Sequence, residues 1–452
     1  MHIKQFVASS LGDASYLVAS GTEAAVIDPQ RDVRPYLAAA EELGVTIRYV
    51  FETHVHNDYI SGGPELAALG ATIVAPHDSG LEFAHLPIED GEEVVVGASR
   101  IRAVRAPGHT HHHTAYLGID EAGETVGAFT GGSIIIGGAG RSDLLGPEHT
   151  EELTRLQWET AKRIESLLPE AAELLPTHGA GSFCSSQQCG GERRAPLAQE
   201  RARNIVLASP DFESFRVLHL ANPGPIPAYY RHMAPINRGG PRLYGTPPRP
   251  SLLTPELLAA EMADGTPVVD VRDRFAFADA HVPGSVSIEE GDATLAYLSW
   301  VTPFNSPLVL VTEDRAQADR FAADLLRIGY EELRGYLPFE AWRAVRPVAS
   351  LDTASVAEAV RIHQEGRQAV YDVRFDSDRR TLALPGSRPL PIDRIEDWVG
   401  DADDVTPLIV CGGGSRATTV ASVLQRRGLR PRALVDGGAA DLVPAPEPVH
   451  SA

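Results

Sequence analysis

Cysteine is scarce in this chain, since only Cys184, Cys189 and Cys411 occur among 452 residues. Three thiols cannot build a disulfide framework, and such low usage is typical of a reducing compartment, where a retained cysteine often has a chemical role. The sequence also lacks an apolar run of about 20 residues that could span a membrane. The N-terminal segment has no apolar centre of the kind found in signal peptides. We therefore expect a cytoplasmic protein with no membrane segment.

Basic residues are outnumbered by acidic ones. The sequence has 40 Lys and Arg against 61 Asp and Glu, which gives a formal net charge of −21. A surface of this sign repels polyanions, so we expect neither nucleic acid nor an anionic membrane as a partner. Hydrophobic residues make up 43% of the chain, which is typical of globular proteins. The length predicts roughly two to four domains.

Regions of different pattern follow one another along the chain. Residues 1–220 alternate short β-rich runs with helical runs. Residues 221–250 are dense in Pro and Gly without periodicity, which predicts an extended connector. Residues 251–347 and 351–443 share one α/β pattern, and residues 444–452 form a tail.

The shared pattern is an internal repeat. The sequence Val-Val-Asp-Val-Arg at 268–272 matches Val-Tyr-Asp-Val-Arg at 370–374, and Pro-Gly-Ser at 283–285 matches Pro-Gly-Ser at 385–387. The members of both pairs are 102 residues apart. In each copy an apolar strand and a helical pattern follow. Alternation of strand and helix predicts a parallel sheet with helices on both faces.

Cys411 stands between a predicted strand and a predicted helix. In a parallel sheet, ligands bind in the loop after the carboxyl end of a strand. Glycines after Cys411 allow backbone N–H groups to turn inward, and the helix start adds a positive dipole end, so we expect a thiol of depressed pKa. The guanidinium of Arg416 can hold an anionic group. We predict Cys411 and Arg416 as catalytic residues. The predicted substrate-binding loop consists of Gly412, Gly413, Gly414 and Ser415.

The order Asp-Val-Arg, Pro-Gly-Ser and a strand-end Cys with Arg five residues later resembles the rhodanese domain over residues 351–443. The resemblance implies that Cys411 carries a persulfide between a donor and an acceptor. The middle copy, residues 251–347, resembles the same domain, but its equivalent position falls within 310–312, where no cysteine stands. Without the nucleophile this copy cannot perform covalent transfer, so we expect a packing or recognition role.

Histidines follow three predicted strands in the N-terminal region. His54, His56 and Asp58 are two residues apart, so in an extended segment they point the same way. His109 follows a Pro-Gly turn, and His178 follows a further strand. Imidazoles gathered at strand ends suit a metal. We expect a site of His54, His56 and His109 with an open water position, where Asp58 or His178 can act as a replacement ligand.

The segments Ser-Tyr-Leu-Val, Val-Ile-Asp-Pro, Thr-His-x-His-x-Asp, Pro-Gly-His-Thr and Phe-Thr-Gly-Gly follow in the order of the metallo-β-lactamase family, which residues 1–220 resemble. The resemblance implies an α/β multidomain protein, with an αββα N-terminal fold followed by two rhodanese-like parallel-sheet domains. The combination resembles the persulfide dioxygenase–rhodanese fusions. It implies oxidation of a glutathione-type persulfide to sulfite at a mononuclear Fe(II) site.

Two positions depart from that family pattern. Tyr59 stands where the motif has a histidine, and Gly132 stands where the family has a metal-ligating aspartate. Loss of one ligand weakens Fe(II) binding, because ligand type and geometry set metal selectivity. Fe(II) by resemblance, Zn(II), and a site without metal therefore all stay open. Thioester hydrolysis of the hydroxyacylglutathione type is disfavoured, because ligands for a second metal are missing.

Further residues are accessory candidates. Arg141 lies where the resemblance places an anion-contacting arginine, and the alternative is a solvated loop residue. Cys184 follows Gly-Ala-Gly-Ser, where it could receive sulfur near the metal, and the alternative is a partly buried thiol. We favour the partly buried thiol for both Cys184 and Cys189. In the run 111–113 adjacent residues face different ways, so we expect at most one to contribute.

The residues leave three functional hypotheses. The first is a bifunctional enzyme that oxidises a persulfide and transfers sulfane sulfur through Cys411. The second is a sulfurtransferase with a degenerate or zinc-binding N-terminal domain. The third is a non-catalytic persulfide sensor or scaffold. The expected partner is a small-molecule persulfide, thiosulfate or thiol, and homo-oligomerisation stays open.

Overall fold

The structure is a computed structural model that describes residues 1–186, 191–245, 247–366, 368–402 and 405–443. The chain divides into two compact units. The first unit consists of residues 1–248 with 323–329, and the second consists of residues 249–322 with 330–452.

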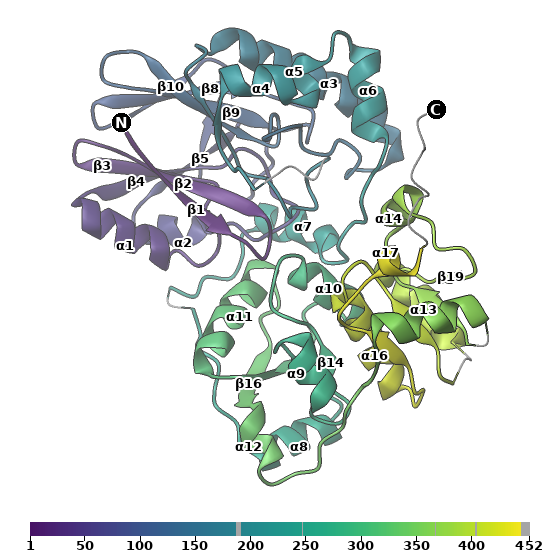
Figure 1. Cartoon of the computed structure of the whole chain (residues 1–452). Coiled ribbons are helices and arrows are strands. Elements are labelled where there is room, and N and C mark those ends of the chain that lie inside the picture. Colours follow the sequence, from purple (N-terminus) through teal and green to yellow (C-terminus); the bar gives the residue numbers. More distant parts are fainter. Residues whose placement is uncertain (187–190, 246, 367, 403–404, 444–452) are drawn as a thin grey trace, which may run out of the picture. The chain divides into compact units, whose positions relative to one another are not determined.

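Two mixed sheets form the centre of the first unit (Figure 1). The order of the first sheet is β1 (His2–Ala8), β2 (Asp13–Ser20), β3 (Glu23–Ile27), β4 (Thr46–Phe51), β5 (Thr72–Pro76) and β6 (Leu86–Ile88). The order of the second sheet is β12 (Ala195–Pro196), β11 (Glu173–Pro176), β10 (Thr125–Gly131), β9 (Thr114–Ile119), β8 (Ser99–Arg105) and β7 (Glu93–Val96). Strands β3 to β6 pair in parallel, and strands β7 to β10 pair antiparallel.

The two sheets pack face to face, with helices on both outer faces (Figure 1). The first sheet is covered by α1 (Arg34–Leu43) and α2 (Gly63–Ala68). The second sheet is covered by α3 (Pro147–Leu167), α4 (Leu197–Arg203), α5 (Ile205–Ala208) and α6 (Phe212–Leu220). This is the αββα layer order expected from the sequence.

Aromatic pairs join the sheets inside this sandwich. The rings of Tyr16 and Phe129 lie 5.3 Å apart, and those of Phe51 and Tyr116 lie 5.0 Å apart. All four side chains are buried, and burial of each stabilises the fold by about 1.5–3 kcal/mol. The Tyr16 hydroxyl donates to the Pro176 carbonyl at 2.7 Å, which ties β2 to the strand end that precedes His178.

The region predicted as an extended connector contains a helix, α7 (Tyr230–Gly239). Tyr230, Met233 and Asn237 are buried and spaced three and four residues apart, as on one helix face. Pro235 lies inside this helix and lacks the N–H donor of a regular turn. The sequence prediction failed here because the surrounding prolines and glycines obscured a short amphipathic period.

The second unit contains two sheets of parallel strands. The first has the order β14 (Val286–Ser287), β13 (Val268–Asp270), β15 (Leu308–Thr312) and β16 (Leu333–Pro338). The second has the order β19 (Arg388–Pro389), β18 (Val370–Asp372), β20 (Leu408–Val410), β21 (Arg432–Leu434) and β17 (Asp352–Ala354). In the first copy, a parallel bridge between Leu252 and Tyr336 takes the place that the edge strand β17 has in the second copy. The sequence repeat therefore corresponds to a repeated strand order.

Helices connect these strands. The first copy contains α8 (Pro255–Ala263), α9 (Arg274–Asp279), α10 (Thr294–Val301), α11 (Arg315–Arg327) and α12 (Phe339–Arg343). The second copy contains α13 (Val356–Glu365), α14 (Asp376–Thr381), α15 (Ile395–Trp398), α16 (Ser415–Arg426) and α17 (Ala439–Leu442), with short 3-10 turns at Ile392–Arg394 and Val399–Asp401. In both copies a strand-end aspartate is buried with an arginine two residues later. The pairs are Asp270 with Arg272 and Asp372 with Arg374, each with a shortest N–O distance of 2.7 Å.

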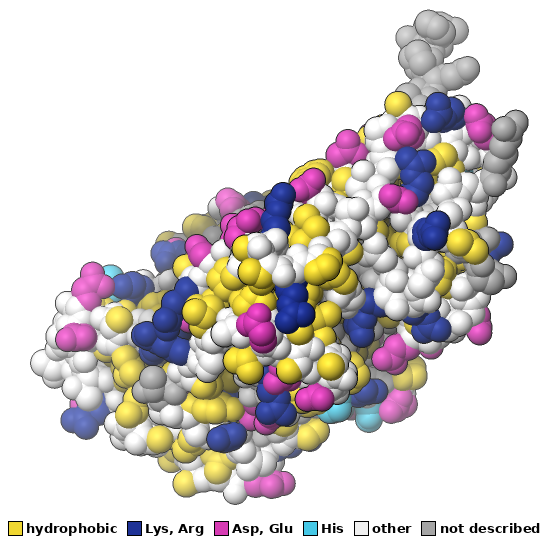
Figure 2. Space-filling view, turned by 90° about the horizontal axis from the view of Figure 1, so that it is seen from below, with side chains coloured by type: hydrophobic (Ala, Val, Ile, Leu, Met, Phe, Trp, Pro, Cys, Tyr) yellow, Lys and Arg dark blue, Asp and Glu magenta, His cyan; other side chains and the backbone are white. Residues whose placement is uncertain are grey.

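Charges of both signs are interspersed on the surface that Figure 2 presents, with hydrophobic side chains among them. This face therefore shows no block of basic residues that would attract a polyanion. Within the described part of the chain, no helix combines the length and the apolar character needed to cross a membrane.

Candidate functional site

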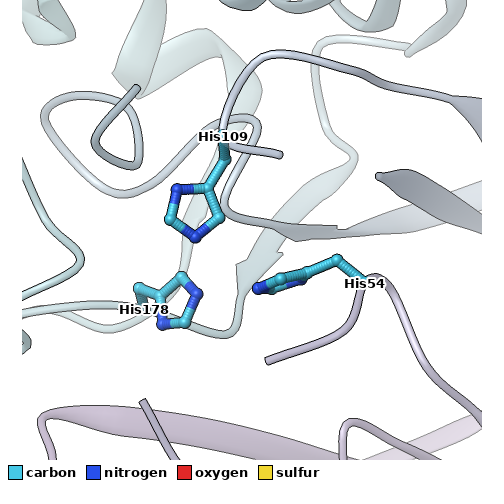
Figure 3. Close-up of side chains that lie close together, drawn as sticks. All are labelled: His54, His109 and His178. Atoms are coloured by element: carbon cyan, nitrogen blue, oxygen red, sulfur yellow. The ribbon is translucent and has the colours of Figure 1, made fainter. Parts of the chain in front are cut away.

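Three buried histidines of the first unit turn their rings toward a common point (Figure 3). His54 lies in the loop after β4, His109 in the loop between β8 and β9, and His178 directly after β11. One ring nitrogen from each lies within 4.8 Å of the other two. The ring centroids of His109 are 5.0 Å from those of both His54 and His178.

Hydrogen bonds at Nδ1 fix the tautomers of these rings. The Thr53 hydroxyl donates its proton to Asp28, so it can only accept, at 2.8 Å, from Nδ1 of His54. Nδ1 of His109 faces the Arg141 carbonyl at 2.7 Å, which also can only accept. In both rings the lone pair is consequently on Nε2, as in metal-binding histidines.

His178 is held in the same way. Its Nδ1 lies 3.0 Å from an Asp13 oxygen and 3.2 Å from an Asp58 oxygen. Among the described residues, Nε2 of His54, His109 and His178 has no hydrogen-bond partner, although all three atoms are buried. Unpartnered buried polar atoms are costly, so three at one point fit a bound cation. Sequence reasoning did not identify Asp13, which no motif marks.

The charges around the rings divide them into two kinds. Burial, together with neighbouring histidines, lowers the pKa of His54 well below its usual value and that of His109 to about 3. Burial also opposes a charge on His178, but Asp58 and Asp13 outweigh it and raise its pKa to about 10. Two neutral imidazoles therefore lie beside a third that is charged without a metal, and a metal that binds Nε2 of His178 has to displace a proton from it.

The ring of His56 lies beside that of His54, but its Nε2 faces other partners. Its Nε2 lies 3.0 Å from the Tyr59 hydroxyl and 3.2 Å from Asp28, and its ring stacks on Tyr59 with centroids 4.3 Å apart. The chain after β4 bends instead of running extended, and the ring centroids of His54 and His56 lie 4.2 Å apart. Burial opposes a charge on His56, yet Asp28 and Glu52 raise its pKa to about 10.

Asp58 and His178, which shared one predicted role, take different positions. Both were candidates for a replacement ligand, and His178 takes the third position of the ring cluster. Asp58 lies behind that ring, on the Nδ1 side. Burial opposes its ionisation, but the charges of His178 and His56 lower the pKa of Asp58, so it stays a carboxylate.

The structure leaves no room for a side chain at position 132. A Cβ at this position would overlap the ring of His109. The Gly132 N–H donates to Nε2 of His113 at 2.9 Å, and its carbonyl accepts from Gln157 at 2.8 Å. The His109 ring therefore fills the space in which an aspartate side chain would begin. Of the run 111–113, only His113 is fully buried, and its ring stacks on His54 at 4.9 Å.

Helix α7 supplies a residue that sequence reasoning missed. The Asn237 side chain accepts from the Ser61 N–H at 2.9 Å and donates to the carbonyls of His56 and Tyr59, both at 2.8 Å. Through these hydrogen bonds Asn237 holds in place the backbone of the loop that carries His54 and His56, called the histidine loop below. Its spacing from Tyr230 and Met233 was the available signal.

The two accessory candidates are both buried. Arg141 forms a bidentate pair with Asp143, at 2.9 and 2.7 Å, and also donates to the Pro225 carbonyl at 3.0 Å. Its guanidinium is bonded within the protein, and the alternative of a solvated loop residue is wrong because the side chain is buried. The Cys184 sulfur lies 3.5 Å from the Tyr230 hydroxyl, and burial raises its pKa well above the usual value. Cys184 is therefore a protonated thiol, and Cys189 lies outside the described residues.

Cys411 lies at the end of β20, under the glycine loop. Its sulfur accepts a hydrogen bond from the Gly414 N–H at 3.0 Å. Gly414 has φ of +96°, and a Cβ there would overlap the Val435 carbonyl, so the turn requires glycine. Cys411 is only 1% exposed, whereas Gly412 and Gly413 are exposed. Ser415 begins α16.

Arg416 is held over the same loop. Its guanidinium pairs with Asp378 at 2.6 Å and lies 4.4 Å from the centre of the Phe375 ring. Burial opposes its charge, but Tyr297, Cys411 and Asp378 raise the pKa of Arg416. The arginine is therefore a fixed positive charge beside the cysteine.

Strand register identifies the residue that replaces the cysteine in the first copy. Asp270 pairs with Val311, and Asp372 pairs with Val410. The next residue is Thr312 in one copy and Cys411 in the other. A buried threonine hydroxyl cannot carry a persulfide.

Family comparisons assign a class to both units. Residues 12–189 match the metallo-beta-lactamase superfamily, and residues 254–343 match the rhodanese-like domain. The chain therefore combines an N-terminal metallo-β-lactamase fold with a C-terminal rhodanese-like α/β domain, which confirms the predicted fold class.

Individual relatives cover different parts of the chain. A solved metallo-beta-lactamase from Staphylococcus aureus is 27% identical, covering 75% of this chain and 99% of that chain with a TM-score of 0.66. ETHE1 from Myxococcus xanthus is 26% identical, covering 53% and 98% with a TM-score of 0.45. A hydroxyacylglutathione hydrolase from Gloeobacter violaceus is 38% identical over 122 residues, 26% of this chain and 46% of that protein. The chain spans about half the length of the curated relatives it matches.

Proposed function

We propose that this protein is a sulfur-metabolism enzyme in which Cys411 takes up sulfane sulfur from a small anionic donor and passes it to a thiol. The observation that carries the proposal is the Cys411 sulfur under a glycine loop, where it accepts the Gly414 N–H at 3.0 Å. The fixed charge of Arg416 lies beside it. Inward N–H groups and a guanidinium stabilise an anionic sulfur and hold an anionic donor.

With thiosulfate as donor, the Cys411 thiolate attacks the outer sulfur. A bond forms between the cysteine sulfur and that atom, the S–S bond of thiosulfate breaks, and sulfite leaves with the bonding electron pair. An acceptor thiolate or cyanide then takes the outer sulfur and regenerates the Cys411 thiolate. No external oxidant is needed for either step.

We propose that His54, His109 and His178 hold a divalent metal through Nε2. Support comes from the three buried, unpartnered nitrogens and from the hydrogen bonds that fix each ring. By resemblance the metal is Fe(II), which when bound would supply the redox chemistry for oxidation of a glutathione-type persulfide to sulfite. Thr53, Asp13 and the Arg141 carbonyl hold the rings in the binding tautomer. The two sites together would form the bifunctional enzyme.

Two measurements test this function. Thiosulfate-dependent sulfuration of cyanide should occur with the full chain and disappear in Cys411→Ser. Oxygen consumption with glutathione persulfide should occur in the iron-loaded protein. No thiosulfate-dependent turnover would refute the sulfurtransferase, and no oxygen uptake at full iron occupancy would refute the dioxygenase.

A second function for the N-terminal domain has its own support. Three histidines with an open position are typical of catalytic zinc, and the matched curated relatives include hydroxyacylglutathione hydrolases. The alternative is therefore a sulfurtransferase with a zinc centre that hydrolyses a thioester. Elemental analysis of the purified protein distinguishes the two, and thioester turnover by the zinc form would support the alternative.

A further inference from the structure

Helix α16, which begins directly after the glycine loop, is packed against the copy that lacks a cysteine. The buried Ser422 hydroxyl accepts the Ser287 N–H of that first copy at 3.0 Å. One turn further along the helix, the Gln425 side chain lies 3.0 Å from Nε2 of His281, which also belongs to the first copy. The first copy therefore holds the helix that follows the glycine loop.

Arg274 of the first copy contacts the glycine loop itself. At the start of α9, it donates from Nε to the Val435 carbonyl at 3.0 Å. A Cβ on Gly414 would overlap that carbonyl and would lie 3.0 Å from the same Nε. The Val435 carbonyl and the Arg274 guanidinium therefore both lie against the glycine whose N–H bonds the Cys411 sulfur.

Glu289 fixes the Arg274 guanidinium. Its two carboxylate oxygens lie 2.9 and 3.0 Å from Nη1 of Arg274. The side chains of Arg274 and Glu289 are 24% and 18% exposed, so the pair is shielded from much of the solvent. Charge-assisted hydrogen bonds of this kind are stronger than neutral ones. The position of Arg274 is therefore set within the first copy.

Two further contacts join the segment after Val435 to the cysteine loop. The Ala439 N–H donates to the Cys411 carbonyl at 2.8 Å. A Cβ on Gly438 would overlap the Gly412 carbonyl. Because this segment and the loop are in close contact, movement of the segment would also displace the loop backbone.

We propose that Arg274 and Glu289, both from the copy without a cysteine, are positioning residues of the Cys411 site. Arg274 holds the Val435 carbonyl, and this carbonyl fixes the turn in which the Gly414 N–H bonds the sulfur. A hydrogen bond from an N–H group to sulfur favours the thiolate over the thiol, so the contact adds to the reactivity of Cys411. The inference deepens the proposed sulfur transfer, on which it rests, and gives the first copy a role in it.

The test measures the pH at which Cys411 ionises, from the ultraviolet absorbance of its thiolate. Each full-length protein is compared with the same protein carrying Cys411→Ser, so that the absorbance of tyrosines and of the other cysteines cancels. In Arg274→Ala the ionisation midpoint should rise by about 0.5–1 pH unit, which shifts the equilibrium about three- to tenfold toward the thiol. Arg274→Lys keeps a charged donor and should recover part of the shift. An unchanged midpoint in Arg274→Ala would overturn the inference.

Glu289→Ala separates position from charge. Loss of the Arg274 charge would by itself raise the midpoint, whereas loss of the Glu289 charge would by itself lower it. Release of Arg274 from its partner should instead raise the midpoint in Glu289→Ala, and a fall would contradict the positioning role. The other ionisable groups that interact at this site, Arg416 with Asp378 and Tyr297, are unchanged in both variants.

Arg315→Ala is the matched control. Arg315 is also the first residue of a helix in the first copy, but it is 59% exposed and pairs at 3.5 Å with Asp319 of its own helix. This variant should keep the wild-type midpoint, and a rise equal to that in Arg274→Ala would overturn the inference. Circular dichroism checks the fold of each variant, and Glu289→Ala decides the question if Arg274→Ala does not fold.

Intact mass of the thiosulfate-treated wild type separates this inference from the proposed function. A gain of one sulfur atom that is absent in Cys411→Ser supports sulfur transfer. If the wild type gains none, the proposed function fails, whatever the ionisation midpoints are. If it gains sulfur and Arg274→Ala ionises at the wild-type midpoint, only the role of Arg274 and Glu289 fails.

Discussion

Substitution of His178 and His56, each by glutamine, decides which histidines bind the metal. The sequence favours His56 as the third ligand with His54 and His109, whereas the structure puts His178 there. At position 56 the amide of glutamine replaces the Nε2 that faces Asp28, whereas at position 178 it replaces the Nε2 that would bind the metal and not the Nδ1 that faces Asp13. The difference in metal affinity between the two variants therefore reports on which Nε2 binds the metal.

The expected magnitude follows from the number of ligands. Structural zinc bound by four ligands has an apparent binding free energy of about 10–16 kcal/mol, or roughly 2.5–4 kcal/mol per ligand. Loss of His178 should therefore weaken metal binding by about 100-fold or more. Nε2 of His56 faces Asp28 and Tyr59, so His56→Gln should act only through the loop, by roughly tenfold or less.

Competition against a chelator of known affinity measures this difference in the full chain, with elemental analysis for stoichiometry. Circular dichroism of both variants checks that the fold is intact. Retained metal in His178→Gln together with lost metal in His56→Gln would refute the structural site and restore the predicted one. His111→Ala, at a half-buried residue outside the cluster, is the control for nonspecific loss.

Further substitutions test the two sites separately. Gly132→Asp should not restore a metal ligand, because its Cβ would overlap the His109 ring. We expect the free energy of unfolding to fall by about 1–3 kcal/mol and metal binding to weaken. An increased iron content in this variant would contradict the prediction. Asn237→Ala removes three hydrogen bonds from the histidine loop and should lower the denaturation midpoint, with about 1–3 kcal/mol for the groups left unpaired, while sulfur loading of Cys411 persists. Cys411→Ser should abolish cyanide sulfuration and leave metal content unchanged; loss of metal in this variant would contradict two independent sites.

The parts of the fold that sequence could predict are those with a period or a repeat. Residues 102 apart marked two copies of one unit, and the structure shows the same strand order in both. The residue equivalent to Cys411 could not be fixed, because the gap between the copies falls before that strand. The strand pairing of Asp270 with Val311 identifies Thr312 as the residue equivalent to Cys411.

The three-histidine site shows a different limit of prediction from sequence. Sequence brought the right loops together, because histidines followed three strands, but it could not give ring directions. His56 lies beside His54, but its Nε2 faces Asp28. Asp13 and Asn237 lie 165 and 181 residues from the groups they hold, His178 and His56, so no local pattern links them.

The two departures from the family pattern, Tyr59 and Gly132, act together to leave one set of free ligands. Tyr59 stacks on His56 and bonds its Nε2, which keeps that ring with Asp28 and Glu52. Gly132 leaves room for the His109 ring. Asp58 faces Nδ1 of His178, and Asp28 faces His56. Among the described residues, one Nε2 from each of His54, His109 and His178 has no hydrogen-bond partner, and three such nitrogens suit one metal ion.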